Sequence, residues 1–221
     1  MNYTTSEENY LKAIFHLQTQ NEIVTTTALA TKLDTKPASV TDMMKKLNAK
    51  KLLNYKPYYG FSLSQEGKKI ALHVIRRHRL WEYFLSEKLK FDWNEIHNLA
   101  EELEHINNKK LIERLDEYLN YPQFDPHGDP IPDSKGKIKK SKKISLAELP
   151  FNKPAEVCQV SNQTNEMLEL LNHKNIGIGT KIEVKKHFNY DQSLEIKIKS
   201  SFMTISETLA KNIYVSYEQD N

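Results

Sequence analysis

The chain has 221 residues, of which 38% are hydrophobic and 28% are charged, and its formal net charge at pH 7 is +3. This length and composition allow a sizeable core in one large or two modest domains. A single cysteine, Cys158, excludes an internal disulfide and any zinc motif built from several cysteines. No apolar run approaches the roughly 20 residues of a membrane helix, and the polar start MNYTTSEENY is not that of a signal peptide. We therefore expect a cytoplasmic protein without a membrane partner.

The first part of the chain has a helical pattern that ends in a hairpin. Thr5 and Ser6 are the expected capping residues of an amphipathic first helix. Pro37 suits the first position of a later helix, where its missing N–H leaves no hydrogen bond unmade. The predicted helices cover residues 4–19, 26–33 and 37–50, and the predicted hairpin covers residues 52–64.

Beyond the hairpin the pattern changes from helical to β. Residues 121–145 are rich in Pro, Gly and Lys and are expected to form a loop and a linker. Long helices are predicted over 65–87 and from Trp93 to about 117, and a short one over 165–172. Strands are predicted over 155–160, 181–186, 194–200 and 212–217. The chain is therefore expected to be α+β, helical first and β-rich last.

Two short helices joined by a tight turn and followed by a hairpin have the order of a winged helix-turn-helix. In the second of these helices Val40, Met44 and Leu47 have the spacing of a buried face. Hydroxyl groups and lysines on the opposite face can reach base edges and phosphates. An ordinary helical bundle with a solvated, lysine-rich face remains the alternative. The predicted DNA-contacting residues are Thr27, Lys36, Pro37, Ser39, Thr41, Asp42, Lys45, Lys46, Tyr58 and Tyr59.

Histidines and glutamates recur at helical spacing in the middle of the chain. In HNLAEELEH, the side chains of Glu101, Glu104 and His105 share one helix face and can converge on one cation, while His97 lies a turn earlier. In RRHRLWEYF, His78 and Glu82 are four residues apart and could meet His97. Each Glu/His pair at helical spacing, taken alone, could equally consist of surface residues or include a histidine packed in the core. Their coincidence with a helix-turn-helix favours metal binding.

The segments SEENYLKAIF, ASVTDMMKKL, RRHRLWEYFL, AEELEH and PHGDPIP together resemble the diphtheria toxin repressor family of iron- and manganese-dependent regulators, over essentially the whole chain. The resemblance implies a homodimer that represses metal-uptake genes by binding palindromic double-stranded operator DNA. It also implies four segments: a winged-helix domain at 1–73, a helical dimerisation and metal-binding domain at 74–133, a linker at 134–147, and an SH3-like (FeoA-like) β-barrel at 148–221.

The resemblance further implies two metal sites per subunit, filled by Mn(II) or Fe(II). The ligands that match the primary site are Asn9, Glu101, Glu104 and His105. Those that match the ancillary site are His78, Glu82 and His97, with Gln163 and Glu166 from the β-barrel. The primary set contains only oxygen and nitrogen donors, which suit manganese and iron.

Three positions are informative when the chain is compared with the family it resembles. Asn9 stands where iron regulators have methionine and manganese regulators have aspartate, and Glu101 matches the manganese type. Lys12 replaces a glutamate that helps manganese regulators build a paired-metal site, which favours two separated sites. Metal would then tie Asn9 to Glu101, Glu104 and His105, and without metal the two glutamates are expected to repel each other.

Two other classes of function remain open. A metallohydrolase would need an open coordination position and a general base in a cleft. The sequence has no HExxH pattern, nucleophile elbow or phosphate loop, so we expect neither an enzyme nor a small-molecule substrate. A metal-independent winged-helix regulator that senses another ligand through its β-barrel is the second alternative.

Overall fold

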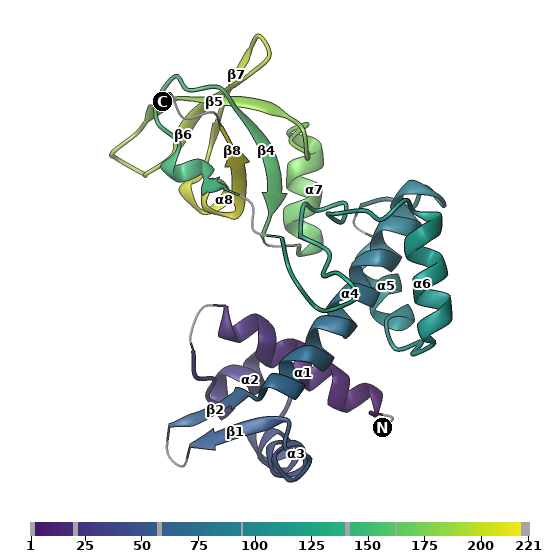
Figure 1. Cartoon of the computed structure of the whole chain (residues 1–221). Helices are drawn as coiled ribbons and strands as arrows, with labels where there is room; N and C mark the ends of the chain where they lie inside the picture. The colour runs from purple at the N-terminus through teal and green to yellow at the C-terminus, as the bar shows by residue number, and fades with distance from the viewer. Residues whose placement is uncertain are drawn as a thin grey trace. The chain divides into compact units, whose positions relative to one another are not determined.

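The computed structural model describes residues 3–19, 22–56, 59–93, 95–139, 142–161 and 163–217, and only the backbone of Lys56. It contains two compact units (Figure 1), one made of Met1–His78, Glu101–Arg114 and Pro132–Lys137, the other of Arg79–Ala100, Leu115–Ile131 and Ile138–Asn221. Among the described residues, no helix has both the length and the apolar character needed to cross a membrane.

The first unit begins with the expected three helices and hairpin. Pro37 occupies the start of the third helix, as predicted. The core of these elements is built from the apolar stripes seen in the sequence, with Leu11, Val40 and Leu47 fully buried. The elements are α1 (Thr5–Gln18), α2 (Thr26–Lys32), α3 (Pro37–Ala49), β1 (Leu53–Lys56) and β2 (Gly60–Leu63). β1 and β2 pair antiparallel, which is the arrangement of a wing after a helix-turn-helix.

The capping residue of α1 is Thr4, and the expected caps Thr5 and Ser6 lie inside the first turn instead. The Thr4 hydroxyl accepts a hydrogen bond from the Glu7 amide at 3.2 Å, and the Glu7 carboxylate accepts one from the Thr4 amide at 3.1 Å. Such a reciprocal capping box requires a glutamate at the third helical position. Thr5 and Glu8 have the same spacing as Thr4 and Glu7, so the sequence pattern did not distinguish the two possible caps, and the prediction was wrong by one residue.

Glu7 also joins α1 to the end of α3. One of its carboxylate oxygens lies 2.7 Å from the Lys50 ammonium and 3.2 Å from that of Lys46. Burial raises the pKa of Glu7, but the hydrogen bonds from Lys50, the Thr4 backbone and Lys46 outweigh it, and the pKa is lowered. The carboxylate therefore stays charged and ties the two helices together.

Three helices follow the hairpin: α4 (Gln65–Glu87), α5 (Ile96–Leu103) and α6 (Lys109–Tyr118). The prediction of one helix from Trp93 to about residue 117 was wrong. The chain turns after Leu103, whose carbonyl accepts from the Ile106 amide at 3.1 Å. The Asn108 side chain then accepts from the Leu111 amide at 3.0 Å and starts a new helix. Glu104 and His105 consequently lie in a turn after α5.

The second unit contains a six-stranded antiparallel sheet of order β3-β8-β4-β5-β6-β7. Register shifts within β4 and β5 are β-bulges, which bend a strand and increase its twist. The interior is filled by alternate apolar residues such as Val157, Val184 and Ile196. The strands are β3 (Ile144–Ser145), β4 (Ala155–Val160), β5 (Lys181–His187), β6 (Leu194–Ile198), β7 (Ser201–Ile205) and β8 (Ile213–Ser216). The helices are η1 (Leu146–Glu148), α7 (Asn165–His173) and α8 (Glu207–Asn212).

The sheet confirms four predicted strands and extends the prediction. The strand expected over 194–200 ends at Ile198 because Lys199 has a positive φ of 54° and turns the chain into β7. β7 and the short β3 carried no clear alternation and were not predicted. The helical first part and β-rich last part confirm the α+β class.

Candidate metal centres and DNA-binding surface

The residues expected to contact DNA lie on the surface of α2 and α3. Thr27, Lys36, Pro37, Ser39, Thr41, Asp42, Lys45 and Lys46 are all exposed. Tyr59 in the wing is 74% exposed, whereas Tyr58 lies outside the described residues. Two of these lysines form ion pairs: Lys45 with Asp42 at 3.4 Å and Lys46 with Glu7 at 3.2 Å. α3 therefore presents hydroxyl and ammonium groups on one continuous face.

The predicted primary ligands lie in the first unit, on α1 and on the segment 101–105. Ligand atoms of Glu101 and Glu104 lie with one from His78 within 4.8 Å of one another. Asn9 lies on α1, and its Oδ1 atom is buried without a hydrogen-bond partner among the described residues. A buried, unsatisfied carbonyl oxygen is costly unless a partner completes it. A cation beside Asn9 would supply that partner, so the donor set fits a metal ion.

Glu104 is completely buried and surrounded by positive or donating groups. The Lys12 ammonium lies 2.7 and 2.9 Å from its two oxygens, and His78 Nδ1 lies 2.7 Å from one of them. Burial raises the pKa of Glu104, but the hydrogen bond from His78 and the charge of Lys12 outweigh it, so the pKa is lowered. The same ammonium lies 2.8 Å from Glu101. The two glutamates are therefore not left facing each other alone, because the single positive charge of Lys12 lies between them and offsets part of the expected repulsion.

His105 is oriented by a residue that the sequence analysis missed. Its Nδ1 lies 2.6 Å from Oε2 of Glu8, and its Nε2 lies 3.5 Å from Oε1 of Glu104. The other Glu8 oxygen accepts from Arg77 at 2.8 Å, and Arg77 also donates to the Glu104 carbonyl. An Nδ1–H donated to a carboxylate leaves Nε2 as the metal-ligating nitrogen. The only sequence signal for Glu8 was a second acid in the first turn of α1.

The second unit brings Glu82 and His97 together and places beside Glu82 two candidate ligands that were not predicted, Asp125 and His127. Glu82 Oε1 lies 3.2 Å from His97 Nδ1 and 3.9 Å from His127 Nδ1. Ligand atoms of Glu82, Asp125 and His127, all buried, lie within 4.8 Å of one another. His78 lies one turn before Glu82 on α4, yet its short contact with Glu104 belongs to the first unit.

The charges in this second cluster favour a cation. Burial and the nearby charges of Glu82 and Asp129 raise the pKa of Asp125 well above its ordinary value. Burial lowers the pKa of His127 despite Glu82 and Asp129, so its ring is neutral near pH 7. The ring also stacks on Trp93, with centroids 5.2 Å apart. Crowded acids and a neutral imidazole are a ligand set that a divalent cation would stabilise.

The two β-barrel residues expected to complete the ancillary site have other positions. Gln163 donates to Asp129 Oδ2 at 2.8 Å, beside Gln159, which donates to Oδ1 at 2.5 Å. Glu166 is exposed in the first turn of α7 and belongs to none of the described groups able to share a cation. The loop that carries Asp125 and His127 was predicted to be a connection, and its PHGDPIP segment supported the family resemblance, but neither residue was predicted to be a metal ligand. An acid and a histidine two residues apart inside it were the available signal.

This loop packs closely against β4. Gly128 has a φ of +83°, and a Cβ atom there would lie 1.9 Å from the Cys158 carbonyl oxygen. The His127 carbonyl accepts from the Val160 amide at 3.0 Å. These contacts fix the position of the His127 backbone relative to β4.

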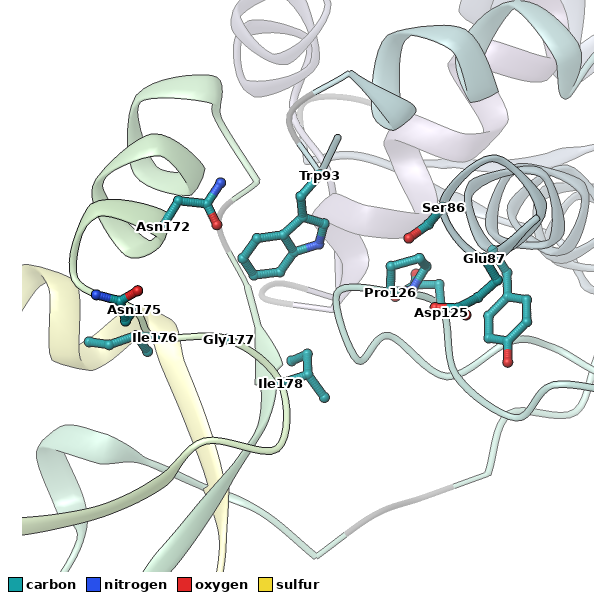
Figure 2. Close-up of a pocket in the computed structure, with 11 residues that line it drawn as sticks. Ser86, Glu87, Trp93, Asp125, Pro126, Asn172, Asn175, Ile176, Gly177 and Ile178 are labelled. Atoms are coloured by element: carbon teal, nitrogen blue, oxygen red, sulfur yellow. The ribbon is translucent and has the colours of Figure 1, made fainter. Parts of the chain in front are cut away.

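A pocket of about 660 Å³ borders the second cluster and includes Asp125 in its lining. Figure 2 shows the Trp93 ring between Asn172 on one side and Ser86 and Pro126 on the other. Among the described residues that line it, Glu87 and Asp125 are acidic and none is basic. The pocket therefore lacks the basic side chains that a phosphate or carboxylate ligand would need.

Comparison with protein families gives three matches in chain order. Residues 2–61 match the model of the iron dependent repressor N-terminal DNA binding domain. Residues 64–133 match the iron dependent repressor metal binding and dimerisation domain, and residues 144–217 match the FeoA domain. The fold is thus a winged helix, a helical dimerisation region and a C-terminal SH3-like β domain.

Individual proteins give the same result. The HTH-type transcriptional regulator MntR of Oceanobacillus iheyensis is 35% identical over 138 residues, covering 62% of this chain and 92% of that protein. The iron-dependent repressor IdeR of Mycobacterium leprae is 26% identical over 173 residues, covering 74% of this chain and 75% of that protein. A solved manganese-dependent transcriptional repressor in complex with manganese superposes with a TM-score of 0.87 at 28% identity, over 96% of this chain and 100% of the other. The chain belongs to the diphtheria toxin repressor family of iron- and manganese-dependent transcriptional regulators.

Proposed function

We propose that this protein is a homodimeric repressor that binds palindromic operator DNA when loaded with Mn(II) or Fe(II), and that it controls metal-uptake genes from the cytoplasm. The observation that carries the proposal is the cluster in the first unit. In this cluster Lys12 and Glu8 of α1 contact Glu101, Glu104 and His105, and the proposed ligands offer only oxygen and nitrogen atoms. The family relatives are named as manganese- or iron-dependent regulators, which agrees with such donors.

The primary site would use Asn9, Glu101, Glu104 and His105. A bound divalent ion supplies concentrated positive charge that links these ligands. Glu8 holds the His105 ring so that Nε2 faces the Glu104 carboxylate. Glu104 stays ionised because His78 and Lys12 lie beside it. The two glutamates and the absence of a thiolate among these ligands lead us to favour manganese over iron.

A second site would use Glu82 and His97 together with Asp125 and His127. The first pair is part of the ancillary set expected from the sequence, which also included His78, Gln163 and Glu166, and the second pair comes from the loop after α6. The proposed segments are the winged-helix domain at 1–73, the helical domain at 74–133, the linker at 134–147 and the β domain at 148–221. The second cluster lies in residues of the helical region, beside a loop that hydrogen-bonds to β4. It is therefore suited to couple metal to the β domain.

DNA recognition would fall to α3, with the wing on the phosphate backbone. Dimers of helix-turn-helix proteins present two such helices to half-sites about 34 Å apart. Metal at the primary site would hold α1 against residues 101–105 and so limit the movement of the winged helix. Linkage then requires DNA to tighten metal binding by the factor by which metal tightens DNA binding.

The test is retention of genomic DNA fragments by purified protein under anaerobic conditions with chelator, Mn(II) or Fe(II). Glu104→Ala removes a buried ligand, and Glu102→Ala, at an exposed neighbouring glutamate, is the matched control. Metal-dependent retention that Glu104→Ala abolishes and Glu102→Ala keeps would support the proposal and rank the two metals. Equal retention with chelator and with metal would leave a metal-independent winged-helix regulator.

A further inference from the structure

The Lys12 ammonium occupies the centre of the primary cluster. Its three N–H groups face three carboxylate oxygens: one of Glu101 at 2.8 Å and both of Glu104 at 2.7 and 2.9 Å. An ammonium has three donors and no acceptor, so these contacts use its whole hydrogen-bonding capacity. The Lys12 side chain is only 13% exposed and that of Glu104 is fully buried. The ammonium therefore lies among these carboxylate oxygens as a bound cation would.

A divalent ion would need the same oxygens. Glu101 and Glu104 are the only anionic members of the proposed primary set, and Lys12 engages both of them. A positive charge held within hydrogen-bonding distance of these oxygens would strongly repel a second cation there. Lys12 has a flexible four-carbon stem, and Glu101 is 44% exposed at its side chain. The ammonium can therefore leave towards water on the Glu101 side when a metal enters.

We propose that Lys12 is a tethered internal cation that holds the primary site in the metal-free protein and competes with the activating metal for Glu101 and Glu104. The inference rests on the proposed function of this site. It makes Lys12 the residue that sets how much metal is needed for activation. It also explains how a fully buried carboxylate beside a second acid is tolerated without metal, since removing one partner of a buried pair is strongly destabilising.

The test compares Mn(II) affinity, measured by competition with a fluorescent chelator, in the wild type and in charge-removing and charge-keeping variants. Lys12→Gln removes the charge but keeps polar contacts to the carboxylates, and Lys12→Met removes both. We expect Mn(II) to bind these two variants about tenfold or more tightly than the wild type, and Lys12→Arg to stay within about fivefold of it. Lys50→Met is the matched control, because Lys50 also pairs with a buried glutamate, at 2.7 Å, but not with a ligand.

A second readout uses the protein without metal. In chelator, Lys12→Gln and Lys12→Met should melt below the wild type, by about 2–4 °C for each kcal/mol lost. Saturating Mn(II) should raise the melting temperature of both variants more than that of the wild type. In the wild type itself, the Lys12 ammonium should give a slowly exchanging ¹H–¹⁵N signal that is lost on adding Cd(II). This signal tests the proposal even where a variant folds poorly.

Unchanged or weaker Mn(II) binding in Lys12→Gln, or a Lys12 signal that persists with saturating Cd(II), would overturn the inference. These outcomes are separable from failure of the proposed function. If the wild type retains DNA equally with chelator and Mn(II) while Lys12→Gln binds Mn(II) more tightly, the repressor proposal fails and the internal cation stands. If retention depends on Mn(II) and Lys12→Gln shows no gain, only the internal cation fails.

Discussion

His105 directs Nδ1 to the Glu8 carboxylate at 2.6 Å and keeps Nε2 towards Glu104, so a residue outside the proposed ligand set determines which nitrogen is available to a metal. We expect Glu8→Gln to weaken Mn(II) binding by about 10–100-fold, the usual cost of losing such a supporting carboxylate. Isothermal titration with Mn(II) measures the change, and Glu102→Gln serves as the control. Saturating Mn(II) should restore DNA binding in Glu8→Gln. A variant that binds Mn(II) as the wild type does would show that Glu8 only pairs with Arg77.

The composition of the second site can be tested by counting bound metal. His127→Ala should reduce Mn(II) from about two equivalents per subunit to about one, because it removes a ligand of the Glu82–Asp125–His127 cluster. Glu166→Gln should retain both equivalents, since Glu166 is exposed at the start of α7. Elemental analysis after gel filtration gives the counts. The opposite pattern would restore Glu166 as the ligand and exclude His127.

The close packing of the 125–131 loop on β4 predicts a strong effect at one glycine. Gly128→Ala places a Cβ atom 1.9 Å from the Cys158 carbonyl oxygen and must adopt a φ of +83°. The backbone conformation alone costs about 1–3 kcal/mol, and the overlap adds to it. Gly177→Ala, where no atom lies within 4 Å of the new Cβ, should change the free energy of unfolding by less than about 0.5 kcal/mol. Urea denaturation compares them, and equal stability of the two variants would contradict the described packing.

The exposed face of α3 predicts how DNA affinity depends on salt. If Lys45 contacts a phosphate, Lys45→Ala should lower the slope of log K against log salt concentration by about 1, uniformly across operator sequences. Lys211→Ala, at an exposed lysine on α8 paired with Glu207 at 2.8 Å, should leave the slope unchanged. Fluorescence anisotropy at several salt concentrations provides the slopes. An unchanged slope in Lys45→Ala would remove Lys45 from the interface.

The lowered pKa of His73 should contribute to the pH dependence of the free energy of unfolding. Burial, followed by the charges of Arg77 and Lys69, lowers its pKa in the folded protein. Below the ordinary value of about 6.5, the unfolded chain takes up this proton more readily than the folded one, so stability is lost as pH falls. The free energy of unfolding of metal-free wild type should therefore fall more steeply between about pH 7 and 5 than that of His73→Gln. Parallel curves would contradict this assignment.

Sequence patterns correctly predicted those helices and strands whose conformation depends mainly on neighbouring residues in the chain. Pro37 suits the first turn of a helix, and the spacing of Val40, Met44 and Leu47 predicted which face of α3 is buried. The spacing of Glu101, Glu104 and His105 predicted one shared helix face, whereas only Glu101 lies on α5 and the other two lie in the turn that follows it. It did not show that α5 ends at Leu103, since a single side chain, Asn108, starts the next helix.

Contacts between residues far apart in the chain could not be predicted from the sequence pattern. Lys12 was recognised as an unusual cation, but its bridge to Glu101 and Glu104 depends on how α1 packs in the first unit. Asp125 and His127 lie in a proline-containing loop with no periodicity to interpret. Their approach to Glu82 depends on the close packing of Gly128 on β4, which a sequence pattern does not encode.

The capping box of α1 has a mechanical consequence. Glu7 contacts Lys46 and Lys50 of α3, and its neighbour Glu8 contacts His105 and Arg77. Successive residues of an α-helix point about 100° apart, so one turn of α1 holds the recognition helix with one carboxylate and the metal-binding segment with the next. A rotation of that turn would change both sets of contacts at once. A change at Thr4 or Glu7, which cap this turn, is therefore expected to disturb the contacts that the turn makes with both α3 and His105.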